Sequence, residues 1–147
     1  MSQRVRYTSV EPESYKTLLG VSEYVRSTEI EKPLRELIFT RASQINRCAF
    51  CLDMHTRDAI EGGESAQRLF ALSAWRDTPF FTPKERAALA LTEHVTLISN
   101  GGVPDDVYEA LTEFFSPKQI VQLIMTIISI NSWNRIAIST GMQPPAP

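Results

Sequence analysis

The segment from Ser116 to Thr140 constrains the fold more strongly than any other part of the chain. It opens with Ser116-Pro117, a pair that favours the first turn of a helix, and residues 120–130 read IVQLIMTIISI. A helix with this pattern is apolar on nearly all sides, so it needs to be enclosed on all sides. We therefore expect either a central core helix or a helix that forms part of a subunit interface.

The rest of the chain also has the pattern of helices, interrupted where proline, glycine and asparagine gather. The strongest start signal is Thr82-Pro83-Lys84-Glu85, which combines a threonine N-cap, a proline at the first helical position and a glutamate at the third. No segment shows strand alternation with hairpin turns. The predicted class is therefore all-α, with helices expected at about 12–28, 33–46, 48–61, 64–76, 82–99, 104–115 and 116–140.

The composition is that of an ordinary globular protein, with 147 residues, 43% hydrophobic residues and a net charge of −2. This length favours one domain over residues 1–147, with irregular segments at about 1–11 and 141–147. The small net charge gives no electrostatic reason to expect nucleic acid or an anionic membrane as a partner. The chain has neither a secretory apolar stretch at its start nor 18 consecutive apolar residues, so the expected location is cytoplasmic.

Residues 47–56 read RCAFCLDMHT and hold the only two cysteines and one of the two histidines. If Cys48 lies at the start of a helix, free backbone N–H groups and the helix dipole favour its thiolate form. The three-residue spacing places Cys48 and Cys51 on neighbouring turns, where they can cycle between dithiol and disulfide. Cys51 and His55 are four positions apart and stack on one helix face, so the imidazole can accept the thiol proton.

A third group normally orients or charges such an imidazole, and Glu36 is the candidate in this sequence. It lies twelve residues before Cys48, and its apolar neighbours, which include Leu37 and Ile38, are expected to pack inward. A glutamate beside a core stripe can be drawn into a partly buried site, where it can pass protons. The spacing alone, however, favours a solvated helix residue.

Two other interpretations of the cysteines stay open. Cys48, Cys51 and His55 could bind a structural zinc ion, with His94 or a carboxylate as the fourth ligand. Such sites usually serve small domains that lack a core, and His94 in LTEHVT is more typical of a surface or core histidine. The cysteines could also be inert core residues, although the nearby histidine argues against this.

Two stretches resemble a known family: LRELIFTRASQINRCAFCLDMHTRDA and RLFALSAWRDTPFFTPKERAALALTEHVT. They look like the AhpD-like alkylhydroperoxidase branch of the carboxymuconolactone decarboxylase family, and the resemblance covers about residues 15–140. The family motif is a glutamate, eleven intervening residues and then CxxCxxxH, which Glu36, Cys48, Cys51 and His55 match at every position. This match makes Glu36 a predicted site residue.

The resemblance implies an all-α domain of six to seven helices around a helical hairpin, assembled into dimers, trimers or hexamers. It implies peroxide reduction in which Cys51 matches the thiol that becomes a sulfenic acid. Cys48 matches the thiol that donates a proton and then closes the disulfide. The best-studied branch has a histidine just before the second cysteine, where this chain has Phe50, so the implied proton relay and partner proteins need not be identical.

The leading hypothesis is a thiol-dependent peroxidase, an alkylhydroperoxide reductase in antioxidant defence, with Cys51, Cys48, His55 and Glu36 as catalytic residues. An external dithiol or protein reductant must restore the cysteine pair by exchange. No metal is expected, and no organic cofactor either, since the sequence has no GxGxxG, P-loop or Schiff-base signature. The decarboxylases of the wider family lack the cysteine pair, so their activity is not expected.

Two alternatives to this hypothesis remain. The protein could be a disulfide reductase that passes electrons to a partner peroxiredoxin, or a non-catalytic helical oligomer that senses oxidation. Within the leading hypothesis, Cys48 lies at the helix start beside Arg47 and is expected to be the more exposed of the two sulfurs.

Overall fold

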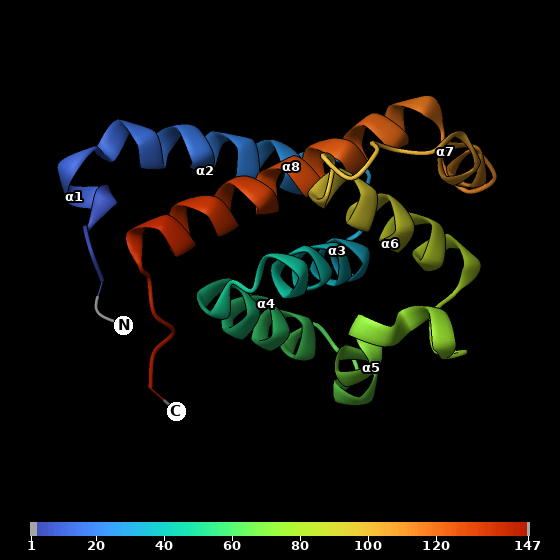
Figure 1. Ribbon diagram of the computed structural model, residues 1–147, viewed down its shortest axis with the longest axis horizontal. Coiled ribbons are helices and arrows are strands. Elements are labelled where there is room, and N and C mark those ends of the chain that lie inside the picture. The colour runs from blue at the N-terminus through green and yellow to red at the C-terminus, as the bar shows by residue number, and fades with distance from the viewer. Residues whose placement is uncertain (1–2, 147) are drawn as a thin grey trace.

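Every regular element in residues 3–146, the part of the chain that this computed structural model describes, is a helix (Figure 1). The predicted all-α class is therefore confirmed. The α-helices are α1 (Tyr7–Val10), α2 (Pro12–Ser27), α3 (Lys32–Asn46), α4 (Ala49–Glu61), α5 (Ala66–Ala71), α6 (Pro83–Thr96), α7 (Asp105–Thr112) and α8 (Pro117–Thr140). A 3-10 helix, η1 (Leu72–Asp77), follows α5 directly.

The long helices begin and end where their local signals lie. At the start of α6, the Thr82 side chain accepts from the N–H of Glu85, and the Glu85 carboxylate accepts from the N–H of Thr82. Ser116 and Gln119 form the same reciprocal cap at the start of α8. Gly141 then ends α8 in the left-handed conformation, with φ of 73°, which glycine adopts without strain.

The structure corrects three details of the predicted pattern. α1 lies inside the N-terminal segment expected to be irregular, because the buried Tyr7 ring packs edge-on against Tyr15 at a centroid distance of 6.1 Å. The helix expected at 64–76 is divided into α5 and η1 by a kink at Ala74, where φ is −116° and ψ is 30°. Residues 3–146 thus hold eight α-helices and one 3-10 helix rather than six to seven helices.

α3 is the central helix of the domain and contacts α4, α6 and α8. It forms a hairpin with α4, while α8 runs beside α2 along the other side of the molecule (Figure 1). Two adjacent residues of α3 enter different parts of the core. Ile38 packs in a cluster with residues of α6, α7 and α8, and Leu37 packs in a cluster with residues of α4, α5, η1 and α6. The α3–α4 hairpin is therefore held from both sides.

α8 is only partly enclosed within one chain. Leu123 and Ile127 are fully buried, whereas Val121 is 56% exposed and Ile128 is 42% exposed. One face of the helix belongs to the core, and the opposite face presents apolar side chains at the surface. None of the helices between residues 3 and 146 combines the length and apolarity needed to cross a membrane.

Candidate active site

The turn between α3 and α4 sets the position of the first cysteine. Arg47 adopts the left-handed conformation, with φ of 57° and ψ of 42°, and the N–H of Cys48 donates to the carbonyl of Ser43 at 3.0 Å. This reversal makes Cys48 the N-cap residue of α4, where its Sγ accepts from the N–H of Cys51 at 3.4 Å. The expected break before CAFC and the position of Cys48 at a helix start are both confirmed.

Both sulfurs lie inside the protein. Cys48 is 1% exposed and Cys51 is 2% exposed; both are free thiols, in a core cluster with residues of α3 and α8. The expectation that Cys48 is the more exposed sulfur is wrong, because α8 packs over the start of α4. Phe50 and Trp133 are partly buried against the same cluster. A substrate can touch either sulfur only after a covering side chain moves.

The two thiols hold their protons with different strength. Hydrogen bonding from Cys51, first from its side chain, lowers the pKa of Cys48 to about 7 although burial opposes the shift. The nearby His55 adds a smaller effect in the same direction. The pKa of Cys51 is raised, first because its S–H is held by the Cys48 sulfur and then because it is buried. When the pair loses its first proton, the thiolate therefore forms on Cys48 and the remaining proton stays on Cys51.

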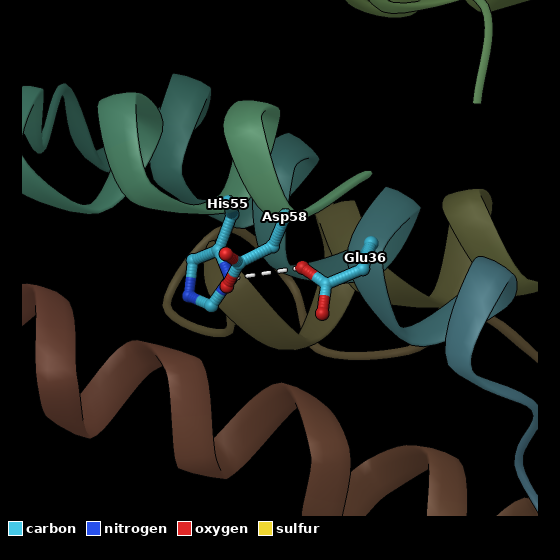
Figure 2. Close-up of side chains that lie close together, drawn as sticks. All are labelled: Glu36, His55 and Asp58. Atoms are coloured by element: carbon cyan, nitrogen blue, oxygen red, sulfur yellow. Dashed lines mark hydrogen bonds and ion pairs between the residues drawn. The ribbon is translucent and has the colours of Figure 1, made fainter. Parts of the chain in front are cut away.

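Glu36 of α3 and His55 of α4 contact each other across the hairpin (Figure 2). Oε2 of Glu36 lies 3.0 Å from Nδ1 of His55, and these residues are 7% and 8% exposed. The Phe39 ring packs against the imidazole at a centroid distance of 4.7 Å. When Nδ1 donates to the carboxylate, Nε2 is the nitrogen left to exchange a proton. Glu36 is thus a buried partner of the histidine and not a solvated helix residue.

The structure therefore brings the four predicted site residues onto one helical hairpin. Cys48 is the N-cap of α4, Cys51 and His55 lie in its first two turns, and Glu36 contacts His55 from α3. Chemically, this arrangement offers a thiolate, a neighbouring thiol and an imidazole that a carboxylate orients. These are the parts of an activated cysteine nucleophile.

Sequence reasoning missed Asn134 of α8, whose side chain is fully buried. Its Nδ2 donates to Oγ of Ser43 at 3.0 Å, and its Oδ1 accepts from Nδ2 of Asn46 at 2.9 Å. Hydrogen bonding from Asn134 also lowers the pKa of both Cys48 and Cys51. An asparagine in a largely apolar helix was the available signal, because a buried amide needs partners.

The zinc ligands considered from the sequence do not come together. His94 lies on α6, where its Nδ1 is 3.2 Å from the carbonyl oxygen of Gly102. Within residues 3–146, a single set of three or more cysteine, histidine and acidic side chains is close enough to surround an ion, and it consists of Glu36, His55 and Asp58. That set contains neither cysteine, and Asp58 is not among the predicted site residues.

Comparison with known proteins agrees with this fold and motif. The sequence model of the Carboxymuconolactone decarboxylase family matches residues 12–94. An uncharacterized Bacillus subtilis (strain 168) protein, YdfG, is 47% identical over 141 residues, which is 96% of each chain. The family match covers the whole α3–α4 hairpin, including all four residues of the motif.

Two solved structures show the same architecture. A protein of unknown function from Agrobacterium tumefaciens, suggested to be the antioxidant defence protein AhpD, is 40% identical, with a TM-score of 0.97 over 99% of this chain and 100% of its own. The debrominase Bmp8 is 18% identical, with a TM-score of 0.81 over 95% of this chain and 75% of its own, and shares the fold. This protein belongs to the carboxymuconolactone decarboxylase family and has the AhpD-like fold.

Proposed function

We propose that this protein is a thiol-dependent peroxidase that reduces hydroperoxides through Cys48 and Cys51 and acts in antioxidant defence. The observation that carries the proposal is the buried hydrogen bond between Glu36 and His55, one helical turn from the cysteine pair. A positioned imidazole and a thiol pair with unequal pKa values are what a cysteine nucleophile requires. The role suggested for the Agrobacterium tumefaciens relative supports the same class of activity.

In the first half-reaction, a Cys51 thiolate forms when its proton passes to the Cys48 sulfur or to Nε2 of His55. The Cys51 sulfur attacks the terminal peroxide oxygen, the O–O bond breaks, and the leaving alkoxide takes a proton to become an alcohol. Cys51 is then a sulfenic acid. The Cys48 thiolate attacks that sulfur and releases hydroxide, which is protonated to water. Two thiols and one hydroperoxide thus give one disulfide, one alcohol and one water.

In the second half-reaction, an external dithiol or protein reductant restores the two thiols by thiol–disulfide exchange. The alternative, a disulfide reductase that passes electrons to a partner peroxiredoxin, uses the same cysteine pair. Turnover of hydroperoxide by the purified protein with only a small dithiol present would exclude a required partner protein. Turnover that appears only when a peroxiredoxin is added would replace the peroxidase proposal with this alternative.

The direct test is oxidation of the reduced protein by several hydroperoxides in stopped flow, followed by mass spectrometry. We expect two free thiols before the reaction, none after it, and a loss of two hydrogens assigned to a Cys48–Cys51 disulfide. Cys48→Ser should accumulate a sulfenic acid on Cys51 that dimedone traps, because no resolving thiol remains. Dimedone adducts on Cys48 in Cys51→Ser, with none in Cys48→Ser, would reverse the two roles. Two thiols that survive stoichiometric peroxide would refute the proposal.

We also propose that the protein is a cytoplasmic homo-oligomer, a dimer, trimer or hexamer. The exposed apolar side chains Val121 and Ile128 on α8 support an interface between copies. Light scattering should give a multiple of 16.6 kDa, and Ile128→Glu should shift it toward the monomer. A wild-type protein of 16.6 kDa at micromolar concentrations would refute the assembly without touching the proposed chemistry.

A further inference from the structure

A second carboxylate lies beside the Glu36–His55 pair. Cys51, His55 and Asp58 follow one another along a single face of α4 at positions i, i+4 and i+7, so Asp58 continues the site at the end away from the cysteines. One oxygen of Asp58, one oxygen of Glu36 and one ring nitrogen of His55 all lie within 4.8 Å of one another. Figure 2 shows the Asp58 carboxylate next to the imidazole, facing the same space as Glu36.

Asp58 and Glu36 line the same cavity, which has a volume of about 190 Å³. Its walls also include Lys32 of α3 and Glu64, which follows α4. Two other acidic groups in this part of the chain are held by arginines: Asp53 pairs with Arg57 at 2.6 Å, and Glu64 pairs with Arg68 at 2.9 Å. No side chain between residues 3 and 146 forms such a pair with Asp58, although this carboxylate is half-buried.

In the proposed reaction, a proton has to reach the buried cysteine pair each time the disulfide is reduced. During reduction of the disulfide, an external thiolate attacks one sulfur and the S–S bond breaks. The second external thiolate then attacks the mixed disulfide. The external dithiol leaves as a disulfide whose two protons were lost to solvent, and the protein sulfurs depart as thiolates. Because the pKa of Cys51 is raised, this sulfur must take up a proton, yet it is only 2% exposed. Side chains that reach from solvent to this sulfur would give the proton a route.

We propose that Asp58 carries protons between solvent and Glu36 through the cavity that both carboxylates line, and so forms the outer end of the path to His55 and Cys51. The inference rests on the proposed function for its reaction, but the step it describes needs no peroxide. The charged and titratable groups around this end are Lys32 and Glu36 on α3, His55 on α4 and Glu64 after it. Glu36 and Glu64 in this set have partners, whereas the side chain of Asp58 has no ion-pair or hydrogen-bond partner within residues 3–146 to hold its proton in place.

The test uses the whole protein oxidised to its disulfide with diamide, so it runs even if no hydroperoxide reacts. Reduction by dithiothreitol is followed in stopped flow from pH 5 to 9, with a chelator present so that no cation binds among the three side chains. Asp58→Asn should slow reduction about tenfold, less than the ~10²–10⁴ expected for a positioned acid, because water entering the cavity replaces part of the path. Asp53→Asn, on the same helix, is the matched control and should keep the wild-type rate.

Two further measurements separate proton transfer from a structural role. Asp58→Glu should restore the rate, and acetate, which is small enough for the cavity, should accelerate Asp58→Asn in a saturable way while leaving the wild type unchanged. The slowing should also deepen as the pH rises and free protons become scarce. An Asp58→Asn rate equal to that of Asp53→Asn would overturn the proposal. A slow variant that neither acetate nor Asp58→Glu rescues would overturn it as well.

Discussion

Two carboxylates near the centre of the domain, the buried Glu36 on α3 and the partly buried Glu93 on α6, have opposite surroundings. Glu93 accepts hydrogen bonds from the Trp75 indole at 2.9 Å, from Arg41 at 2.9 Å and from Arg76. Within residues 3–146, the Glu36 carboxylate has one hydrogen-bond partner, Nδ1 of His55 at 3.0 Å. The first carboxylate is surrounded by permanent donors, and the second contacts an imidazole.

This difference determines what each carboxylate can do. Burial alone would raise the pKa of Glu93, but hydrogen bonds from Arg76, Trp75 and Arg41 outweigh burial and lower it. Arginine stays protonated at every pH at which proteins fold, so Glu93 remains a fixed charge that ties η1 and α3 to α6. Glu36 instead contacts an imidazole, the type of group that serves most often as an acid or base in proteins. Burial of an acid is therefore not enough to identify a candidate site, and the chemistry of its partner has to be considered as well.

The largest expected effect distinguishes the two carboxylates by reaction rate. Glu36→Gln and His55→Gln should each slow peroxide reduction by roughly 10²–10⁴, the range for a positioned acid or base. Glu93→Gln should leave the rate within a few-fold of wild type, because Glu93 makes its contacts with arginine and tryptophan. Stopped-flow oxidation of each reduced variant measures this, with circular dichroism to confirm folding. Equal rates in Glu36→Gln and Glu93→Gln would abolish the distinction.

The second expected effect concerns stability and sets Glu93 apart from Glu36. Glu93→Gln should lower the free energy of unfolding at pH 7 by about 1–3 kcal/mol, because hydrogen bonds to a charged group are lost and two arginines keep a weaker partner. Urea unfolding followed by tryptophan fluorescence measures this, since Trp75 is itself a partner of Glu93. Glu23→Gln on α2 is the control; Glu23 is exposed, so the change should stay within about 0.5 kcal/mol.

The difference in the free energy of unfolding between wild type and Glu93→Gln should change with pH in a definite direction. The pKa of Glu93 is lower in the folded protein than in the unfolded chain, so the stabilisation is fully present above the unfolded value of about 4.3. It is lost as the pH falls through the folded value. The stabilities of wild type and Glu93→Gln should therefore begin to converge as the pH falls below about 4.3, and they should meet only below the folded pKa of Glu93. A difference that stays constant throughout the acid range, as far as the acid-unfolding transition, would show that packing, not charge, is responsible.

The sequence predicted the helices well because their ends have local causes. The caps at Thr82 and Ser116 and the glycine at 141 satisfy backbone groups of their own helix, and none of them depends on the rest of the fold. α1 was missed because it depends on the packing of Tyr7 against Tyr15 of α2, and the kink at Ala74 was missed because no proline or glycine in residues 66–77 marks it. Local signals predict where a helix ends, whereas tertiary contacts decide whether a short one forms.

The residues of the candidate site also differ in whether local sequence or tertiary structure reveals them. Cys48, Cys51 and His55 lie within eight residues, so helical spacing alone brings them together, and the family motif adds Glu36. Asn134 lies on α8, far along the chain; its place in an apolar helix indicates a buried amide, but only the structure shows that its partner is Ser43 beside the cysteines. The burial of Cys48 was mispredicted for the same reason, because α8 covers it. Asp58 has the helical spacing of a site residue, but only the structure shows the cavity it shares with Glu36.

The smallest expected effect concerns the cysteine pair. Here the ionised group is the Cys48 thiolate, and its partner, the Cys51 thiol, can itself lose a proton. The pKa of Cys48 is about 7, chiefly because Cys51 donates a hydrogen bond from its side chain. Cys51→Ala removes this donor and should raise the pKa of Cys48 toward about 8.5 or above, whereas Cys51→Ser keeps a hydroxyl donor and should fall between the two. Thiolate absorbance at 240 nm during a pH titration reports this without a reagent that has to reach the buried sulfur. Each Cys51 variant retains one cysteine, so the signal belongs to Cys48 alone.

The thiolate fraction at pH 7 should fall about tenfold in Cys51→Ala. The control, Glu93→Gln, should leave the wild-type transition unchanged, because the Glu93 carboxylate contacts arginines and not the cysteines. Midpoints that stay near the wild-type value of about 7 in both Cys51→Ala and Cys51→Ser would show that the start of α4, and not the neighbouring thiol, stabilises the Cys48 thiolate.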